Sequence, residues 1–383
     1  MDNKQQTGRI SLGGRLASSE AFISVAASLI CIVIGLALGV VVLAMINAEH
    51  AIGDGLLVIL ESGIKSARNM GTVLANAAPL IMTGLSVGFA FKTGLFNIGA
   101  AGQYTLGAFG ALYCAIILQL PWYLCLLAAM IFGALWGAIP GIFKAYLNIN
   151  EVITAIMFNW IGLYMVNDIM YGKGKSPMYD LSTTKTYSLR KAAPDSMIPS
   201  CGMSDLFGKL QSVTIAIFIA AFFAVIVYII LNKTTFGYEL RACGFNKNAA
   251  KYAGINEKRN IVLSMMIAGA LVGVGAGLYY LSTVAEWNPQ VSTALPAMGF
   301  NGISAALLAC SNPIGTVFSS LFISYITVGG TKLSTQYYTK EIADVITALI
   351  IYLCAFSLLF KNKIRALLAG KKRGISAGKG GDD

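Results

Sequence analysis

Long runs of apolar residues, separated by short polar segments, recur along the whole 383-residue chain. Each run holds about 20 residues with few charges, the length that an α-helix needs to cross the hydrocarbon core of a bilayer. The pattern therefore predicts an all-α fold, a polytopic membrane helical bundle of about ten transmembrane helices, some of them broken or short. The expected spans are residues 21–46, 70–91, 96–118, 122–143, 151–171, 213–231, 261–281, 296–310, 313–330 and 341–360.

The composition supports the same class, because 56% of the residues are hydrophobic, 12% are charged and the mean hydropathy is +0.70. A soluble domain could not bury that much apolar surface. The first run is longer than the core of a signal peptide and lacks a small-residue cleavage site, so we expect it to be retained. The chain thus divides into an N-terminal tail of residues 1–20, one transmembrane domain of residues 21–360 and a basic C-terminal tail of residues 361–383.

The positions of Lys and Arg predict the orientation of the bundle. An even number of spans puts both termini on one side, and the positive-inside rule selects that side. With cytoplasmic termini, the inner segments carry 18 of the 28 basic residues, six of them in residues 232–260 and seven after residue 360. Segment 172–212 is then an external loop, and 232–260 is a cytoplasmic loop. The net charge of +11 is ascribed to this orientation, and no nucleic acid partner is expected.

Two side-chain amides interrupt the third apolar run. In a continuous helix, Gln103 would share one face with Gly99 and Gly107, and Asn97 would share a different face with Tyr104. An amide without a partner costs several kcal/mol in hydrocarbon. The two amides therefore either line a polar path or tie neighbouring helices together by hydrogen bonds. The glycines between them also permit a break in the helix, which is tolerated at depth only inside protein or beside water.

Four further residues are candidates for the same path. Asn159 lies in the fifth span, and Asn301 and Ser304 lie in the eighth. Trp287, in an external segment, could cap a cavity by stacking on a planar ligand, or it could belong to the aromatic belt at the membrane interface.

Glycines recur at four-residue intervals in two of the expected spans. This spacing makes a smooth stripe on which another helix can approach closely. We expect these glycines to serve packing and take no site from them. The stripes are Gly133, Gly137 and Gly141 in one span and Gly269, Gly273 and Gly277 in another.

The sequence lacks the residues that several classes of function require. No acid or base lies firmly in the middle of an expected span, which disfavours a carrier driven by protons or sodium ions. A membrane enzyme would need a metal-ligand cluster, a nucleophile elbow or a carboxylate pair, and the sequence contains none of these, nor a Walker A motif. We therefore expect a non-enzymatic protein that binds no cofactor of its own.

The cytoplasmic loop contains a very short predicted helix. Asn246 suits its N-cap, Ala249, Tyr252 and Ala253 form an apolar face, and Gly254 suits the position after its C-terminus. Two helical turns span only about 10 Å. Because helices this short are marginal in water, something must hold this one: the rest of the protein, the lipid surface or a partner.

Four sequence blocks, in this order, resemble the permease subunits of bacterial ATP-binding cassette (ABC) importers of the nucleoside and simple-sugar type, related to ribose and branched-chain amino acid permeases. The resemblance covers residues 75–362, and its first block is closer to nucleoside members than to ribose permeases. The blocks are GLFNIGAAGQYTLGA from Gly94, NEVITAIMFNWIGLYMVN from Asn150, TTFGYELRACGFNKNAAKYAGI from Thr234 and GFNGISAALLACSNPIGTV from Gly299.

The resemblance implies a multi-pass permease of the bacterial plasma membrane that forms the translocation path for nucleosides. It implies three partners: an extracellular substrate-binding lipoprotein, a second permease that forms a heterodimer with this one, and an ATPase subunit that holds ATP and Mg²⁺. Segment 236–255 would dock on the ATPase. Its contact residues would be Glu239, Arg241, Asn246, Ala249, Ala250, Tyr252, Ala253 and Gly254.

Two departures from the family pattern bear on the substrate. Many relatives carry an acid where this chain has Ala101, and a basic residue where it has Cys310 and Ser311. A simple sugar therefore remains the alternative substrate. The alternatives from other classes are an ion-coupled secondary transporter and a scaffold that transports nothing.

Overall fold

The computed structural model describes residues 20–171, 177–288, 294–333, 337–339, 341–355 and 362–363. Apart from Glu20 and residues 362–363, the two predicted tails lie outside these residues. The described chain is almost entirely helical, which confirms the all-α polytopic bundle.

Each of the ten expected spans contains a helix. Seven of the described helices are long and apolar enough to cross a membrane: α2, α4, α6, α7, α10, α13 and α15. The bounds of all ten are α2 (Glu20–Ile46), α4 (Ala67–Lys92), α5 (Ala100–Ile116), α6 (Trp122–Leu147), α7 (Glu151–Tyr171), α10 (Ala216–Lys233), α13 (Glu257–Leu281), α14 (Ala297–Leu308), α15 (Pro313–Gly330) and α16 (Glu341–Ala355).

Two expected spans differ most from their helices. α14 has 12 residues, so it is about 18 Å long and does not cross a bilayer by itself. α5 begins at Ala100 rather than at residue 96, because the preceding glycines and polar residues form an irregular connection. Both corrections confirm that short helices belong to this bundle.

The connections carry small elements that hydropathy does not reveal. Between α2 and α4 lie the π-helix η1 (Ala51–Leu57) and α3 (Val58–Ser62). The long loop after α7 holds an antiparallel pair of strands, β1 (Tyr179–Asp180) and β2 (Lys185–Thr186), with Tyr179 opposite Thr186. It then forms α8 (Leu189–Ala192), η3 (Pro194–Ser196) and α9 (Met203–Leu206). The loop after α10 contains α11 (Thr235–Phe245) and α12 (Lys247–Tyr252).

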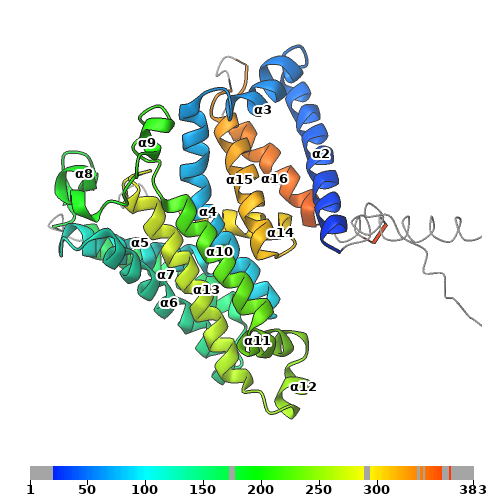
Figure 1. Cartoon of the computed structure of the whole chain (residues 1–383), viewed down its shortest axis with the longest axis vertical. Helices are drawn as coiled ribbons and strands as arrows, with labels where there is room; N and C mark the ends of the chain where they lie inside the picture. The colour runs from blue at the N-terminus through cyan, green and yellow to red at the C-terminus, as the bar shows by residue number, and fades with distance from the viewer. Residues whose placement is uncertain are drawn as a thin grey trace, which may run out of the picture.

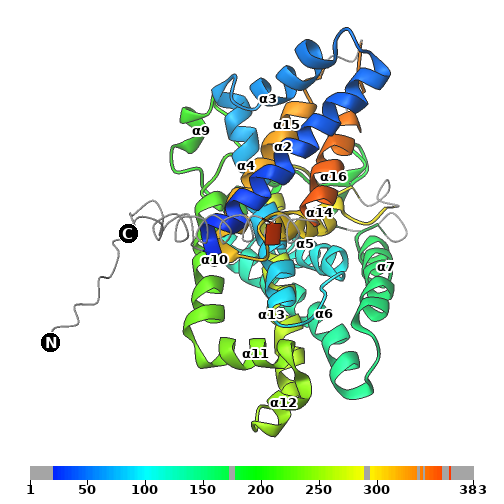
Figure 2. The same cartoon turned by 90° about the vertical axis from the view of Figure 1, so that its right-hand side faces the viewer.

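Helix α4 forms the centre of the bundle. It is buried along most of its length and contacts α13, α15, α14 and α10. Figure 1 shows α2, α15 and α16 on one side of it and α5, α6 and α7 on the other. Figures 1 and 2 both show α11 and α12 projecting together from one end of the molecule.

The two predicted glycine stripes pack against each other, which confirms their expected use. α6 and α13 make the most extensive helix–helix contact in the described chain. A Cβ atom at Gly273 would lie 2.1 Å from the Ala129 carbonyl oxygen, and one at Gly269 would lie 2.2 Å from that of Gly133. Only hydrogen side chains allow such an approach of two helix backbones.

Candidate functional site

The connection between α4 and α5, residues 93–99, turns back into the bundle. Asn97 in this segment donates a hydrogen bond to Ser86 Oγ, 2.9 Å away. Ser86 lies six residues before the end of α4, which is about 9 Å back along the helix axis. The segment is therefore irregular backbone inside the helical core, where it is tolerated only because protein surrounds it. Gly94, with φ +74°, makes the first turn.

Asn97 and Gln103 form a reciprocal pair of amides. Asn97 Nδ2 donates to Gln103 Oε1 at 2.8 Å, and Gln103 Nε2 donates to Asn97 Oδ1 at 2.9 Å. Both side chains are buried, at 0% and 1% exposure. The prediction that they occupy different faces of one helix is wrong, because Asn97 precedes α5 and its side chain reaches Gln103 from the connection.

Asn159 joins this cluster from α7. Its Nδ2 donates to the carbonyl oxygen of Ile98 at 3.0 Å, and its Oδ1 accepts from the backbone N–H of Gly102 at 2.8 Å. The N–H groups of the first helical turn have no partner within their own helix, so Asn159 satisfies one of them from another helix. Three of the predicted path residues therefore meet at the start of α5. We call Asn97, Gln103 and Asn159 the amide cluster.

Gln103→Leu measures how much the hydrogen bonds between Asn97 and Gln103 stabilise the fold. The change leaves hydrogen-bonding groups of Asn97 without that partner, so the free energy of unfolding should fall by about 1–3 kcal/mol. The double variant with Asn97→Leu should lose less than the sum of the single losses, since neither orphaned amide remains. Unfolding in detergent with the four members of this cycle measures the coupling.

Uptake per folded molecule then separates the hypotheses. If the cluster lines the path, uptake falls in the double variant beyond its loss of folded protein. If the amides only tie segments together, uptake per folded molecule equals that of the unaltered protein. Gln211→Leu is the control, because Gln211 is exposed in the loop after α9.

Asn301 and Ser304 lie on α14, which is next to the amide cluster, but they are not part of that cluster. α14 approaches the core through glycine, since a Cβ at Gly299 would lie 2.6 Å from the Ala101 Cα atom. Asn301 is exposed and Ser304 is half-buried. An exposed amide on a short apolar helix points to water or to another polypeptide at that surface, because lipid would leave it unpaired.

Trp287 is connected to Tyr104 through the ring of Tyr280, and it follows Glu286, which lines a cavity beside the β1–β2 hairpin. It is only 4% exposed, and its ring packs edge-on against Tyr280 with centroids 5.7 Å apart. Its backbone pairs with Thr186 of β2, whose N–H donates to the Trp287 carbonyl oxygen at 2.9 Å. A tryptophan buried in this way is not part of a lipid-facing aromatic belt. The ligand-stacking hypothesis stays a prediction.

The neighbouring cavity has a volume of about 420 Å³ and both apolar and charged walls. Tyr280 and Leu112 supply apolar surface from α13 and α5. Lys185 lies 3.9 Å from Glu286 across it, and Arg190 donates to Thr283 Oγ1 at 3.1 Å. The cavity therefore lies between the β1–β2 hairpin and α8 on one side and the last turn of α13 on the other.

Tyr104 is a site residue that the sequence did not single out. Its ring centroid lies 6.2 Å from that of Tyr280, so rings extend from beside Gln103 to the cavity that Tyr280 lines. In the described part of the chain, neither the Tyr104 hydroxyl nor Trp287 Nε1 has a hydrogen-bond partner. A buried polar atom without a partner costs about 1–3 kcal/mol. The signal in the sequence that could have identified Tyr104 was its position in an apolar run, next to the predicted site residue Gln103.

The predicted short helix is present as α12. Asn246 Oδ1 accepts from the N–H of Ala249 at 3.0 Å, and Gly254 adopts φ +81° after the helix. Ala250 is 4% exposed and holds α12 to the protein, whereas Tyr252 is 93% exposed. The predicted apolar face of Ala249, Tyr252 and Ala253 is thus entirely exposed.

The remaining predicted coupling residues, Glu239 and Arg241, lie on α11, and Glu239 attaches this helix to the bundle. Glu239 Oε2 accepts from Asn260 Nδ2 of α13 at 3.4 Å. Arg241 Nε donates to the Gly237 carbonyl oxygen of its own helix at 3.4 Å. Phe245, at the end of α11, is 92% exposed. The end of the molecule therefore presents aromatic rings on a scaffold that is itself anchored to α13.

Comparison with known proteins gives a consistent result. Residues 69–355 match the family model described as branched-chain amino acid transport system / permease component. The chain is 35% identical to the nucleoside ABC transporter permease protein NupB of Lactococcus lactis and 33% identical to the guanosine ABC transporter permease protein NupP of Bacillus subtilis, each over 91% of this chain and 97% of the relative. It is 27% identical to the glucose ABC transporter permease protein TsgB13 of Haloferax volcanii, over 93% of both. No solved structure matches.

Proposed function

Because the chain belongs to the family of branched-chain amino acid transport system permease components, we propose that it forms the translocation path of an ABC importer for nucleosides. The observation that carries the substrate class is the identity of 35% and 33% to a nucleoside and a guanosine permease over nearly the whole chain. ATP would be hydrolysed by a separate subunit, so this chain acts as a transport subunit and not as an enzyme.

The chemistry of the described interior suits an uncharged, partly flat substrate. The amide cluster offers donors and acceptors without a formal charge, which match the base edges and ribose hydroxyls of a nucleoside. The rings of Tyr104, Tyr280 and Trp287 offer stacking surface, worth about 1–3 kcal/mol per base when an aromatic side chain stacks on it. Tyr104 OH and Trp287 Nε1, two of the buried groups without a hydrogen-bond partner in the described residues, would gain hydrogen bonds from such a substrate.

A simple sugar is the second candidate, and the relationship to the glucose permease of Haloferax volcanii favours it. Sugar hydroxyls would use the same amides. The flat base distinguishes the two, because an aromatic ring can stack on a base, which a monosaccharide lacks.

The exposed amide of Asn301 supports a path that a second permease completes. A hetero- or homodimer placed against α14 would bury this side chain between the two protomers and give it polar neighbours. We assign Asn301 and Ser304 to this shared wall, with the amide cluster directly behind it across Gly299 and Ala101.

ATP hydrolysis on the ATPase subunit would be coupled to transport through α11 and α12. The exposed ring of Tyr252 suits a groove on an ATPase subunit. This end would be cytoplasmic, as would both termini, in agreement with the basic residues of segment 232–260. A substrate-binding lipoprotein would dock at the opposite end, near the cavity that Lys185, Arg190 and Tyr280 line. In the described residues of α4, α5, α6, α10 and α15 there is no Asp or Glu, so the coupling carboxylates of many ion-driven carriers have no counterpart there.

Reconstitution tests this proposal. Proteoliposomes containing this chain, its ATPase, a second permease and the binding lipoprotein should accumulate guanosine only when ATP and Mg²⁺ are present on the ATPase side. Glucose uptake under the same conditions measures the alternative substrate. Guanosine accumulation by the chain alone, driven by a proton or sodium gradient, would show a secondary carrier and contradict the proposal.

A further inference from the structure

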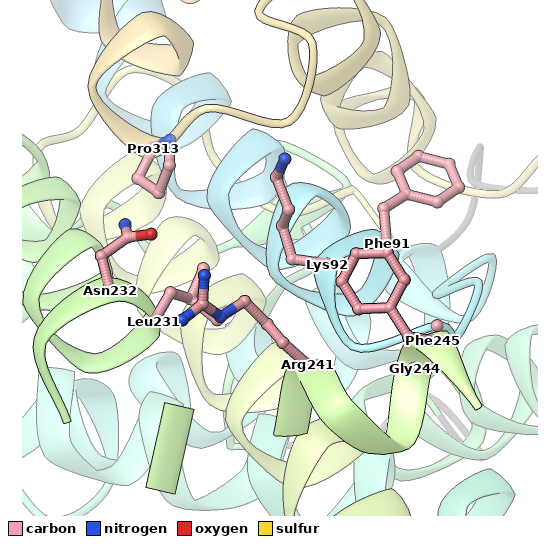
Figure 3. A pocket seen from close by; sticks show the side chains of 9 residues that line it. Phe91, Lys92, Leu231, Asn232, Arg241, Gly244, Phe245 and Pro313 are labelled. Atoms are coloured by element: carbon pink, nitrogen blue, oxygen red, sulfur yellow. The ribbon is translucent and has the colours of Figure 1, made fainter. Parts of the chain in front are cut away.

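A second cavity lies where the α11–α12 segment joins the bundle, and none of its residues belongs to the amide cluster. It has a volume of about 250 Å³. Figure 3 shows its side chains coming from the end of α4, the end of α10, α11 and the start of α15. The residues that matter here are Lys92 of α4, Asn232 of α10, and Arg241 and Phe245 of α11.

This cavity contains two cationic side chains and no carboxylate in its lining. Within the described residues, neither Lys92 nor Arg241 forms an ion pair, and the hydrogen bond from Arg241 to the Gly237 carbonyl oxygen uses Nε alone. The terminal nitrogens of Arg241 and the ammonium of Lys92 are therefore available to a ligand. Two cations around one cavity repel each other and attract an anion.

A neighbouring cavity shows that the absence of a carboxylate beside the cations is particular to the first cavity. It lies across the close contact of Gly94 with Gly244, both of which line the two cavities, and it has a volume of about 210 Å³. Its two lysines are both neutralised: Lys144 lies 2.8 Å from Glu151, and Lys247 lies 3.9 Å from Glu257. The same end of the molecule thus balances the charge in one cavity and leaves it unbalanced in the other.

The other walls favour a ligand with a flat ring. Phe245 is 92% exposed and borders the cavity, so its ring face is accessible for stacking. Asn232 is exposed, and its Nδ2 donates to the Tyr228 carbonyl oxygen at 3.1 Å, so its amide oxygen is the group that it supplies at the opposite wall. Lys and Arg are the usual ligands of phosphate oxygens. An aromatic ring, an amide and two cations together match a phosphate ester that carries a heterocyclic base.

We propose that this cavity binds a nucleoside monophosphate from the cytoplasm, with the phosphate on Lys92 and Arg241 and the base on Phe245. The ligand would connect α11 to α4, α10 and α15. Because α11 carries α12, the bound ligand holds the coupling segment against the bundle and slows transport. This regulatory part rests on the proposed function: an importer of nucleosides supplies a phosphorylating reaction, and its monophosphate product then limits further uptake. The binding part does not depend on transport.

Binding is measured on the purified permease in nanodiscs of phosphatidylcholine, by calorimetric titration with GMP, guanosine and inorganic phosphate. GMP should bind more tightly than phosphate, and guanosine should not bind to this cavity. Lys92→Gln should weaken GMP binding tenfold or more, as expected for the loss of a charge-assisted hydrogen bond. Lys92→Arg should restore it. Lys233→Gln removes the same charge one residue from Asn232 but outside the lining, and it should leave GMP binding unchanged.

Four results would overturn the proposed site. The first is equal GMP binding by Lys92→Gln and the unaltered protein. The second is guanosine binding that Lys92→Gln weakens as much as it weakens GMP binding. The third is occupation by a lipid headgroup, seen if nanodiscs of phosphatidylglycerol bind through Lys92 while GMP does not bind in phosphatidylcholine. If GMP binds the permease alone but not the complex with its ATPase, the cavity belongs to that subunit interface and the proposal also fails.

The regulatory effect has its own readout. In ATP-driven proteoliposomes, GMP on the ATPase side should lower the guanosine uptake rate of the unaltered complex, and Lys92→Gln should transport at the normal basal rate without this inhibition. Unchanged uptake at a GMP concentration that saturates the site would overturn the regulatory part. Since the binding titration contains no ATPase and no lipoprotein, its outcome is independent of whether the transport proposal holds.

Discussion

Gly273→Ala is expected to prevent assembly of the helical bundle. The new methyl group would lie 2.1 Å from the Ala129 carbonyl oxygen and 3.2 Å from the Gly133 Cα atom, both in the backbone of α6. α13 cannot move away from α6 to make room, because α5 packs against its other side. A Cβ at Gly107 of α5 would already lie 2.5 Å from the Gly273 Cα atom. Backbone cannot rotate away as a side chain can, so the helices must separate. The free energy of unfolding should fall by about 3 kcal/mol or more, the upper end of overpacking costs.

The measurement is the yield of monodisperse protein in detergent, together with its thermal unfolding midpoint. Two alanine substitutions provide a graded control. Gly277→Ala lies one turn along the same stripe but would meet the tip of the flexible Leu126 side chain at 2.8 Å, so a small loss is expected. Gly53→Ala has no neighbouring atom within 4 Å and should be neutral or slightly stabilising. Equal behaviour of all three variants would contradict backbone packing as the reason for these glycines.

Replacing Tyr252 and Ala253 together by Asp should abolish coupling while leaving the membrane core folded. Both side chains are exposed, so the unfolding midpoint should hardly change. In a docked complex, the change would remove an aromatic anchor and place two carboxylates against an apolar groove. The loss of an anchor of this kind costs about 2–4 kcal/mol, a thirtyfold or greater loss of affinity. Copurification of the ATPase and ATP-driven uptake should therefore both fall below detection.

Leu206→Asp is the matched control for this prediction. Leu206 is 75% exposed and lies on α9, far from α12 in Figure 1. It should leave copurification of the ATPase unchanged, because only charge at α12 disturbs that contact. Undiminished copurification of the Tyr252/Ala253 variant would exclude docking through this face. A lipid-docked α12 would instead show reduced binding to anionic vesicles in that variant, with recruitment of the ATPase intact.

Local properties of the sequence were sufficient to predict that each expected span contains a helix, and to predict α12. Whether a segment prefers lipid depends on the sum of transfer free energies over about 20 consecutive residues, which a hydropathy pattern contains in full. A capped two-turn helix is equally local, since Asn246 and Gly254 act within one turn of their own positions. The glycine stripes also predicted a packing face on each helix, although the sequence did not indicate that α6 and α13 pack against each other.

The candidate site was only partly predictable. The polar residues were identified because amides are costly in an apolar run. Their arrangement was not, since Asn97 was expected in a helix and instead lies in a connection that folds back toward Ser86. Tyr104 and the cationic cavity around Lys92 were missed because tyrosine and lysine are ordinary residues in an interfacial position. Their significance comes from what surrounds them: a hydroxyl without a partner in one case, a missing counter-ion in the other.

The sequence by itself determined that this chain enters a membrane as helices, where those helices lie, and which short segment has the caps of an independent turn. The tertiary structure decided which polar groups meet, which remain without partners and which face outward. Asn159 reaches Gly102 across 57 positions and Thr93 reaches Ser264 across 171. Burial of apolar surface is additive along a chain, whereas a hydrogen bond or a counter-charge needs one particular partner at one distance, and only the folded packing of the helices supplies it.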